Sequence, residues 1–138
     1  MSYVVAGDKI YDSNEILRDI KEAISFKNIK DISAGSKRED TLIFHLLLDA
    51  EELKKQLLEE LDTTELEDEE LVSELLILAD ERVALIEEYI PEDFISYGYS
   101  YHYDEGNNEI KAIFVAVDEI VGELRLKDVS ERILRSLD

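Results

Sequence analysis

The sequence predicts an α+β fold: a single domain in which an antiparallel or mixed sheet of β-hairpins packs against a central acidic helical hairpin, in the order ββαββααβββα. Three observations predict this class. Apolar residues alternate with polar ones in several short segments, as in strands, and recur every three to four residues in others, as in amphipathic helices. Four N-cap residues, each followed by glutamate three positions later, stand directly before helical segments. Acidic residues are concentrated in the two middle helical segments.

The first predicted elements are a short hairpin and a helix. Residues 3–11 give two short strands with a turn near Gly7 and Asp8. Asp12 and Glu15 form the first capping pair, so a helix is expected to start there. Its apolar face consists of Ile16, Ile20, Ala23 and Ile24.

Residues 28–49 predict a second hairpin. The polar segment SKRED, residues 36–40, is expected to be its loop. Residues 42–48 are apolar at almost every position, which indicates a strand buried on both faces. His45 lies inside this strand, and we expect a hydrogen-bonded core histidine there rather than a ligand.

Two helices, together about residues 49–90, form the predicted helical hairpin. Their capping pairs are Asp49 with Glu52 and Thr64 with Glu67. The second helix is expected over about 65–90, because Pro91 disfavours helix in the residue before it. Its apolar positions cover well over the roughly 100° of a usual apolar face, so either the sheet and the other predicted helix of the hairpin or another subunit should cover it on two sides. These positions are Val72, Leu76, Ala79, Val83, Ile86 and Ile90, with Leu71, Leu75, Leu78, Leu85 and Tyr89 beside them.

The stretch YGYSYHYDEGNNEIKAIFVAV, residues 97–117, places four tyrosines at alternate positions and predicts a hairpin that turns near Gly106 and Asn107. A regular register sets Tyr103 against Ile110, Tyr101 against Ala112, Tyr99 against Phe114 and Tyr97 against Ala116. All four tyrosines would then share one face, which we assign to the outside of the sheet. The opposite face, which carries the small residues Ser96, Gly98 and Ser100 together with Ile113, Val115 and Val117, is expected to pack on the long helix.

The chain is predicted to end with one more strand and a helix. Residues 121–127, VGELRLK, alternate again and predict the strand, and Asp128 with Glu131 forms the last capping pair. No repeat or linker divides the sequence, so we expect residues 1–138 to form one domain.

Composition excludes several kinds of chemistry. The chain has no cysteine, which rules out disulfides, thiolate metal sites and cysteine nucleophiles. It has no glycine-rich phosphate loop, nucleophile elbow or zinc-binding helix motif. His102 lies near Asp104 and Glu105, but this spacing matches no metal motif. We therefore predict no catalytic residue, no cofactor and no metal ligand.

The charge of the chain predicts the kind of partner it binds. The net charge is −20, and residues 49–92 alone hold 17 acidic and 3 basic residues. Such a field repels nucleic acid and anionic lipid and attracts basic surfaces. Residues 1–30 are charged throughout, which argues against a signal peptide, and no apolar run reaches the roughly 20 residues of a spanning helix. We expect a cytoplasmic protein that binds neither nucleic acid nor membranes directly.

The leading functional hypothesis is an acidic interaction module that binds a basic protein surface. One form of it is an inhibitor of viral or host-defence origin that mimics nucleic-acid phosphate and occupies a nucleic-acid-binding protein. The acidic helical face consists of Glu67, Asp68, Glu69, Glu70, Glu74, Glu81, Glu87 and Glu88.

A second candidate surface is the tyrosine face, because tyrosine is enriched among the residues that dominate interfaces. Its residues are Tyr97, Tyr99, Tyr101 and Tyr103, for a partner or for self-association. Two alternative functions remain open. One is a homo-oligomeric structural or adaptor domain, such as a homodimer, without catalytic activity. The other is a carboxylate-dependent metal enzyme, which would need a pocket where His102 or the row from Glu67 to Glu74 meets another acidic side chain.

Overall fold

The main sheet has four antiparallel strands in the order β3-β4-β6-β5. Its strands are β3 (Asn28–Asp31), β4 (Thr41–Asp49), β5 (Phe94–Asp104) and β6 (Glu109–Asp118). A separate hairpin consists of β1 (Tyr3–Ala6) and β2 (Lys9–Asp12). The structure is a computed structural model, and it describes residues 3–61 and 68–137. The predicted α+β class is confirmed, with two antiparallel sheets instead of one.

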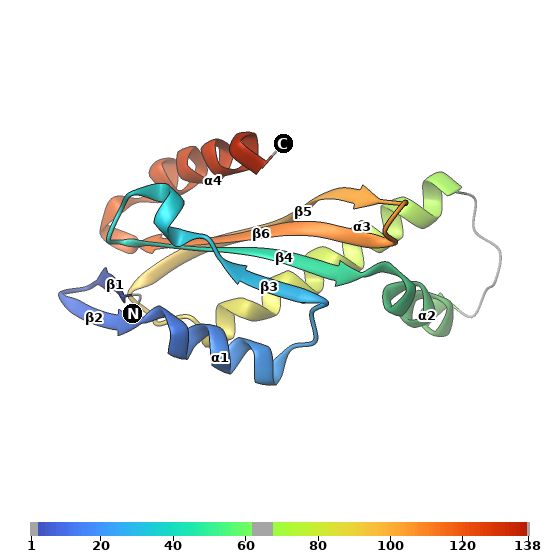
Figure 1. The fold of residues 1–138 in the computed structure, drawn as a ribbon, viewed down its shortest axis with the longest axis horizontal. Coiled ribbons are helices and arrows are strands. Elements are labelled where there is room, and N and C mark those ends of the chain that lie inside the picture. Colours follow the sequence, from blue (N-terminus) through green and yellow to red (C-terminus); the bar gives the residue numbers. More distant parts are fainter. Residues whose placement is uncertain (1–2, 62–67, 138) are drawn as a thin grey trace.

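Helices cover both faces of the main sheet (Figure 1). On one face lie α1 (Ser13–Ala23), α2 (Ala50–Leu61) and α3 (Asp68–Ala84). On the other lies α4 (Glu123–Leu137). Three short 3₁₀ turns complete the described elements: η1 (Ser33–Ser36), η2 (Leu85–Tyr89) and η3 (Glu119–Val121).

The central strand β4 supplies both hydrophobic layers. Side chains of Leu42, Phe44 and Leu46 join the core under the three-helix face, whereas Ile43 joins the smaller core under α4. All four are completely buried. This arrangement confirms the predicted strand with two buried faces, because neither face of its first half is left for water.

Local capping signals located two of the helix starts correctly. The Asp12 carboxylate accepts a hydrogen bond from the Asn14 amide at 2.9 Å, and the Asp49 carboxylate accepts one from the Glu51 amide at 2.9 Å. These bonds satisfy amides that have no partner in the first turn of a helix. The pair of Thr64 with Glu67 lies outside the described residues.

The prediction for the last segment is wrong. Residues 121–127 form no strand, because α4 already begins at Glu123. Asp128 is therefore no N-cap; it lies inside the helix, 3.1 Å from the Arg132 guanidinium. The side chains of Leu126, Val129 and Ile133 recur at helical spacing and bury the same face of α4 against the sheet. Residues 121–127 are too few to distinguish the two-residue period of a strand from the 3.6-residue period of a helix.

The long predicted helix ends earlier than expected. The α-helix α3 stops at Ala84 and continues as the 3₁₀ turn η2 to Tyr89, just before Pro91. Its inner side packs on β5 and on α2 within the same chain. The Arg82 guanidinium fixes this helix pair, since it bonds the Glu52 carboxylate at 2.9 Å and the Gln56 side-chain oxygen at 3.1 Å.

Candidate functional site

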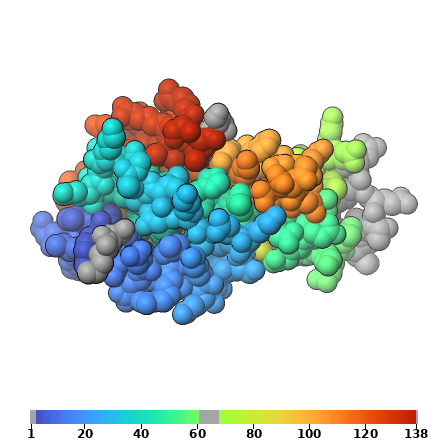
Figure 2. All heavy atoms as spheres, viewed as in Figure 1, coloured from blue at the N-terminus to red at the C-terminus, as the bar shows by residue number. Residues whose placement is uncertain are grey.

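The predicted acidic helical face lies on the outer side of α3 and η2. We call it the acidic surface and define it by Asp68, Glu69, Glu70, Glu74, Glu81, Glu87 and Glu88. Six of these residues are exposed and Glu74 is partly buried. Figure 2 shows the first turns of α3, in yellow-green, projecting at the end of the molecule beside α2. Glu67, also predicted for this face, lies outside the described residues.

The acidic surface is not neutralised by nearby bases. Within residues 3–61 and 68–137, no ion pair includes any of its seven carboxylates. Arg82 is the basic residue in the last turn of α3, and its guanidinium is turned toward α2. Asp80 is also excluded from the surface, because its carboxylate accepts two hydrogen bonds from Ser100, each 2.7 Å long.

Large apolar side chains are exposed among these carboxylates. Ile77 is 50% exposed, Leu85 is 47% exposed and Tyr89 is 37% exposed. Ile77, Glu81 and Leu85 follow at intervals of four residues, which places them on one side of a helix. A row of exposed apolar side chains bordered by carboxylates has the composition of many protein interfaces, which combine an apolar centre with a polar rim.

The tyrosine strand departs from the predicted register at a β-bulge. Tyr103 lies opposite Ile110 as predicted, but the pairing shifts between Ser100 and His102, so that Tyr101 is the extra residue. Beyond the bulge the predicted pairs are wrong. Tyr99 lies opposite Ile113, Tyr97 lies opposite Val115, and Ser100 takes the position opposite Ala112 that was predicted for Tyr101.

The bulge divides the four tyrosines between the two faces of the sheet. Tyr97, Tyr99 and Tyr101 lie on the α4 side, where the last two pack against the smaller core. Tyr103 lies on the side of α2 and α3, with the Lys54 ammonium 5.9 Å from its ring centroid. The prediction of a single tyrosine face is therefore wrong.

The predicted packing of small residues against the long helix is confirmed. The Ser100 hydroxyl oxygen lies 3.3 Å from the Leu76 carbonyl oxygen of α3, and Gly98 lies directly against Val83. Opposite them in β6 are Ala112, Phe114 and Ala116, and not the branched residues Ile113, Val115 and Val117 that the regular register predicted. Those branched residues pack under α4 instead.

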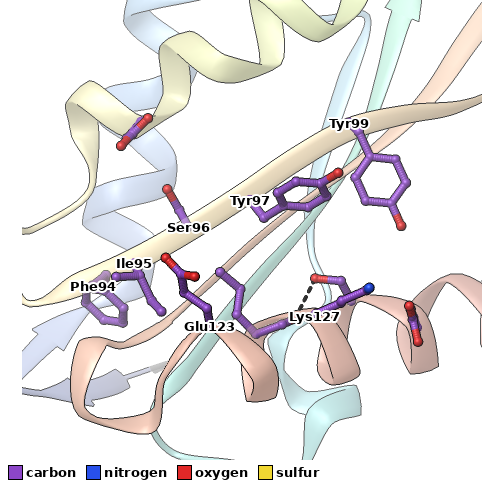
Figure 3. Close-up of a pocket in the computed structure, with 11 residues that line it drawn as sticks. Phe94, Ile95, Ser96, Tyr97, Tyr99, Glu123 and Lys127 are labelled. Atoms are coloured by element: carbon purple, nitrogen blue, oxygen red, sulfur yellow. Dashed lines mark hydrogen bonds between the residues drawn. The ribbon is translucent and has the colours of Figure 1, made fainter.

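Two of the tyrosines line a groove between β5 and α4, which we call the β5–α4 groove (Figure 3). Its volume is about 600 Å³. The rings of Tyr97 and Tyr99 lie 5.1 Å apart between centroids and are tilted by 59°. Tyr97 is 56% exposed, so its ring is accessible from solvent. The charged residues that line the groove are Glu87 from η2 and Glu123, Lys127 and Glu131 from α4.

The electrostatic environment of the groove is negative. It contains three carboxylates and one ammonium group. Burial raises the pKa of the Tyr99 hydroxyl, and the neighbouring Tyr97 and Glu131 raise it further, so Tyr99 is a neutral hydrogen-bond donor. That hydroxyl makes no hydrogen bond within the part of the chain that the structure describes. The Ser130 hydroxyl, by contrast, donates to the Leu126 carbonyl at 2.8 Å, as the dashed line in Figure 3 shows.

The third tyrosine of the α4 side contacts His45. The Tyr101 hydroxyl and His45 Nε2 form a hydrogen bond of 2.8 Å, so the predicted hydrogen-bonded histidine is confirmed, although it is only partly buried. Burial lowers the pKa of His45, and the positive charges of Lys111 and Lys30 lower it further.

Lowering the pH from 7 to 5 is expected to destabilise the wild-type protein more than a His45→Gln variant, whose amide keeps a bond to Tyr101. Because the folded protein holds the pKa of His45 below its ordinary value, the unfolded chain binds more protons once the pH falls below about 6.5. This stability is complete above about pH 6.5 and is lost as the pH falls toward the lower, folded pKa. Urea unfolding across this range measures the effect, and an equal pH dependence of both proteins would contradict it.

The remaining titratable candidates do not form a metal site. His102 is exposed, and hydrogen bonds from Asn107 lower the pKa of the Asp104 carboxyl. Across residues 3–61 and 68–137, no group of three or more histidine, aspartate or glutamate side chains is arranged to hold a metal ion.

Sequence reasoning found the acidic surface and the tyrosines but missed the groove. Glu123 and Lys127 fall in the segment that the sequence predicts as a strand and Glu131 falls in the predicted last helix, so no sequence pattern places the three beside β5. None of the described helices is both long and apolar enough to cross a membrane. No protein-family model, curated protein or solved structure matches this chain, so its function is inferred from its own residues.

Proposed function

We propose that this protein is an acidic interaction module that binds a basic surface of a partner protein through the acidic surface of α3 and η2. One observation supports this proposal most strongly. The carboxylates of the acidic surface have no basic partner within the described residues, and exposed Ile77 and Leu85 lie between them. A partner with lysine and arginine side chains around an apolar patch would complement both features.

The two kinds of side chain would contribute differently to binding. A concentrated negative field accelerates the encounter with a basic surface and makes association sensitive to salt. A few side chains that are fully desolvated at the centre of a contact supply most of the affinity. Tyr89 belongs to the same stripe and offers a large ring with few rotatable bonds.

Mimicry of nucleic acid is the specific form of this function that we propose. Duplex DNA carries one charge per roughly 1.7 Å of its axis, and an α-helix rises about 1.5 Å per residue. Consecutive Asp68, Glu69 and Glu70 follow one another at about 1.5 Å along the helix axis, and the seven carboxylates within residues 68–88 average one per about 4.5 Å. The partner would then be a nucleic-acid-binding protein such as a nuclease, and the module an inhibitor of viral or host-defence origin.

Charge reversal at the start of α3 tests the proposal. A Glu69→Lys, Glu70→Lys, Glu74→Lys variant changes the net charge from −20 to −14. The immobilised protein is challenged with the DNA-binding proteins of its source organism and eluted with a salt gradient. We expect the wild type to retain basic proteins at about 50 mM salt and the variant to bind them at least tenfold more weakly. This difference should shrink at about 1 M salt, where the Debye length is near 3 Å.

A matched control separates local charge from total charge. The variant Asp19→Lys, Glu22→Lys, Glu119→Lys gives the same net charge of −14 by changing exposed carboxylates outside the acidic surface. We expect it to bind like the wild type. Duplex DNA should displace the retained proteins if the module mimics nucleic acid. Equal retention by both triple variants would contradict the role of the acidic surface, and binding that DNA does not displace would contradict mimicry alone.

A further inference from the structure

The strand β5 is an edge strand of the main sheet, and the β5–α4 groove extends along its outer side. Figure 3 shows Tyr97 and Tyr99 on this strand above α4, with Glu123 directed toward the strand from the first turn of α4. An edge strand presents backbone amides and carbonyls that a further strand can pair with. The groove therefore combines side-chain recognition with an open line of backbone groups.

Hydrogen bonds at both ends of the groove show which backbone groups point outward. The Phe94 amide donates to the Pro91 carbonyl at 3.1 Å, and the Ser100 amide donates to the Asp80 carboxylate at 2.7 Å. Both amides thus point away from β6. Alternate residues of an antiparallel strand direct their backbone groups to the same side. Ser96 and Gly98 lie between these two residues at alternate positions, so their amides and carbonyls also point outward.

These outward groups of Ser96 and Gly98 are unpaired. Within the described parts of the chain, neither residue makes a backbone hydrogen bond outside the ladder to β6, and no side chain caps them. The open stretch, residues 95–99, is about 16 Å long at about 3.3 Å per residue. It is long enough for a strand of about five residues, bounded by the Asp80 cap at one end and by Pro91 at the other.

We propose that the β5–α4 groove binds an extended, arginine-bearing segment of the partner as a fifth strand beside β5. This inference rests on the proposed function and specifies the partner's contacting segment. Side chains of such a strand alternate between two faces. Every second residue would lie on the α4 side, over the rings of Tyr97 and Tyr99 and near the carboxylates of Glu123 and Glu131.

Charge complementarity selects arginine as the occupant of these positions. The groove has three carboxylates against one lysine, and two adjacent tyrosine rings. A guanidinium stacks on an aromatic face and binds a carboxylate with two parallel hydrogen bonds, whereas an ammonium group does neither as well. A second copy of the chain, paired strand to strand, would bring the carboxylates of both grooves together. The occupant that fits is therefore a basic segment and not β5 of another copy.

The test uses a short synthetic probe whose backbone can be blocked selectively. The peptide acetyl-Arg-Val-Arg-Val-Arg-amide, paired antiparallel to β5, sets its arginines on the tyrosine side. Its valines then lie opposite Ser96 and Gly98 and direct their amides to β5. We expect binding to change the NMR signals of the Ser96 and Gly98 amides and to slow their hydrogen exchange. N-methylation of both valines should weaken binding at least tenfold, whereas N-methylation of the last two arginines should not.

A Ser96→Pro variant gives the corresponding test from the protein side. The Ser96 amide points outward, so proline removes no hydrogen bond to β6, and edge strands tolerate proline at such positions. We expect the variant to lose at least tenfold in affinity for the peptide. A Glu123→Gln, Glu131→Gln variant should also bind more weakly, while the matched Glu15→Gln, Glu22→Gln variant on α1 should not. If Ser96→Pro failed to fold, binding of the two methylated peptides to the wild type would still test whether the peptide pairs with β5.

The outcomes distinguish this proposal from the proposed function. If the peptide changes only the signals of Glu69, Glu70 and Glu74, or if methylation of the valines has no effect, strand addition is overturned while the acidic surface keeps its role. Protection of Ser96 and Gly98 that rises with protein concentration and needs no peptide would identify a second copy as the occupant and overturn the arginine assignment. The charge-reversal experiment tests only the acidic surface, because its three substitutions lie outside the groove.

Discussion

Replacing Phe44 with alanine is expected to destabilise the protein by about 3–5 kcal/mol, the usual cost of removing a buried aromatic side chain. Phe44 lies at the centre of β4, is completely buried and faces Phe114 of β6, which is also buried. Its ring belongs to the core shared by the sheet and the three helices on that face. The cavity left by alanine cannot be filled without moving β6 or a helix, so little of the lost contact is recovered.

Urea unfolding followed by circular dichroism measures this loss. Phe44→Leu keeps most of the volume and should cost clearly less, while Ile10→Ala removes a side chain that is 71% exposed and should stay within about 0.5 kcal/mol of the wild type. Because small proteins are stable by only about 5–15 kcal/mol, the alanine variant would be close to unfolding at moderate temperature. A cost for Phe44→Ala no larger than that for Ile10→Ala would contradict the central position of β4.

Features set by neighbouring residues could be predicted from the sequence. The starts of α1 and α2 depend on hydrogen bonds that the Asp12 and Asp49 carboxylates accept from amides two residues later, and the local pattern contains both partners. The burial of β4 follows from an apolar run that leaves no polar face. The clustering of acidic residues on α3 could also be predicted by counting them along the sequence, because helical spacing determines which side chains lie on one side of a helix.

Features that depend on tertiary context could not be predicted. Residues on both sides of the bulge keep the same alternation, so nothing in the period marks Tyr101 as the extra residue. The groove depends on the packing of α4 against β5, which brings Glu131 close enough to Tyr99 to influence its pKa. No local pattern relates two residues so far apart along the chain.

The acidic surface and the β5–α4 groove adjoin each other in the structure. Glu87 belongs to the acidic surface of η2, and it lines the same groove as Tyr97 and Tyr99. The Asp80 carboxylate strengthens this connection, because it joins α3 to the Ser100 amide at the edge of β5. The position of α3 relative to β5 therefore determines how the acidic helix and the groove are arranged around one partner.

Gly98 determines how closely α3 approaches β5, and Gly98→Ala is expected to cost about 1–3 kcal/mol, the usual range for an overpacked core. A Cβ atom at this position would lie 2.6 Å from Val83 Cγ1 and 2.9 Å from Phe114 Cδ2. The φ angle of Gly98 is not positive, so conformation does not demand glycine there. Gly→Ala substitutions without such a clash usually increase stability by about 0.4–1 kcal/mol, so the expected loss of stability here is due to packing alone.

Matched variants identify the clash as the cause. Gly35→Ala places its Cβ no closer than 4.0 Å to Ile133 Cδ1 and should cost nothing measurable. Val83→Ala removes the obstructing methyl groups, so the double variant with Gly98→Ala should be more stable than the sum of the two single losses predicts. A coupling energy of about 1 kcal/mol in this direction is the expected result for side chains in contact. Strict additivity would show that α3 is not held against β5 at this point.

The same substitution also tests whether the spacing between helix and strand protects the edge of β5. If the alanine methyl group pushes α3 away, the bond between the Asp80 carboxylate and the Ser100 amide must lengthen, because its donor and acceptor lie on the two separating elements. Hydrogen exchange of the Ser100 amide should then be faster in Gly98→Ala and return toward the wild-type rate when Val83→Ala is added. Exchange that stayed slow in Gly98→Ala would mean that β5 moves with the helix, and the cap at that end of the groove would not depend on Gly98.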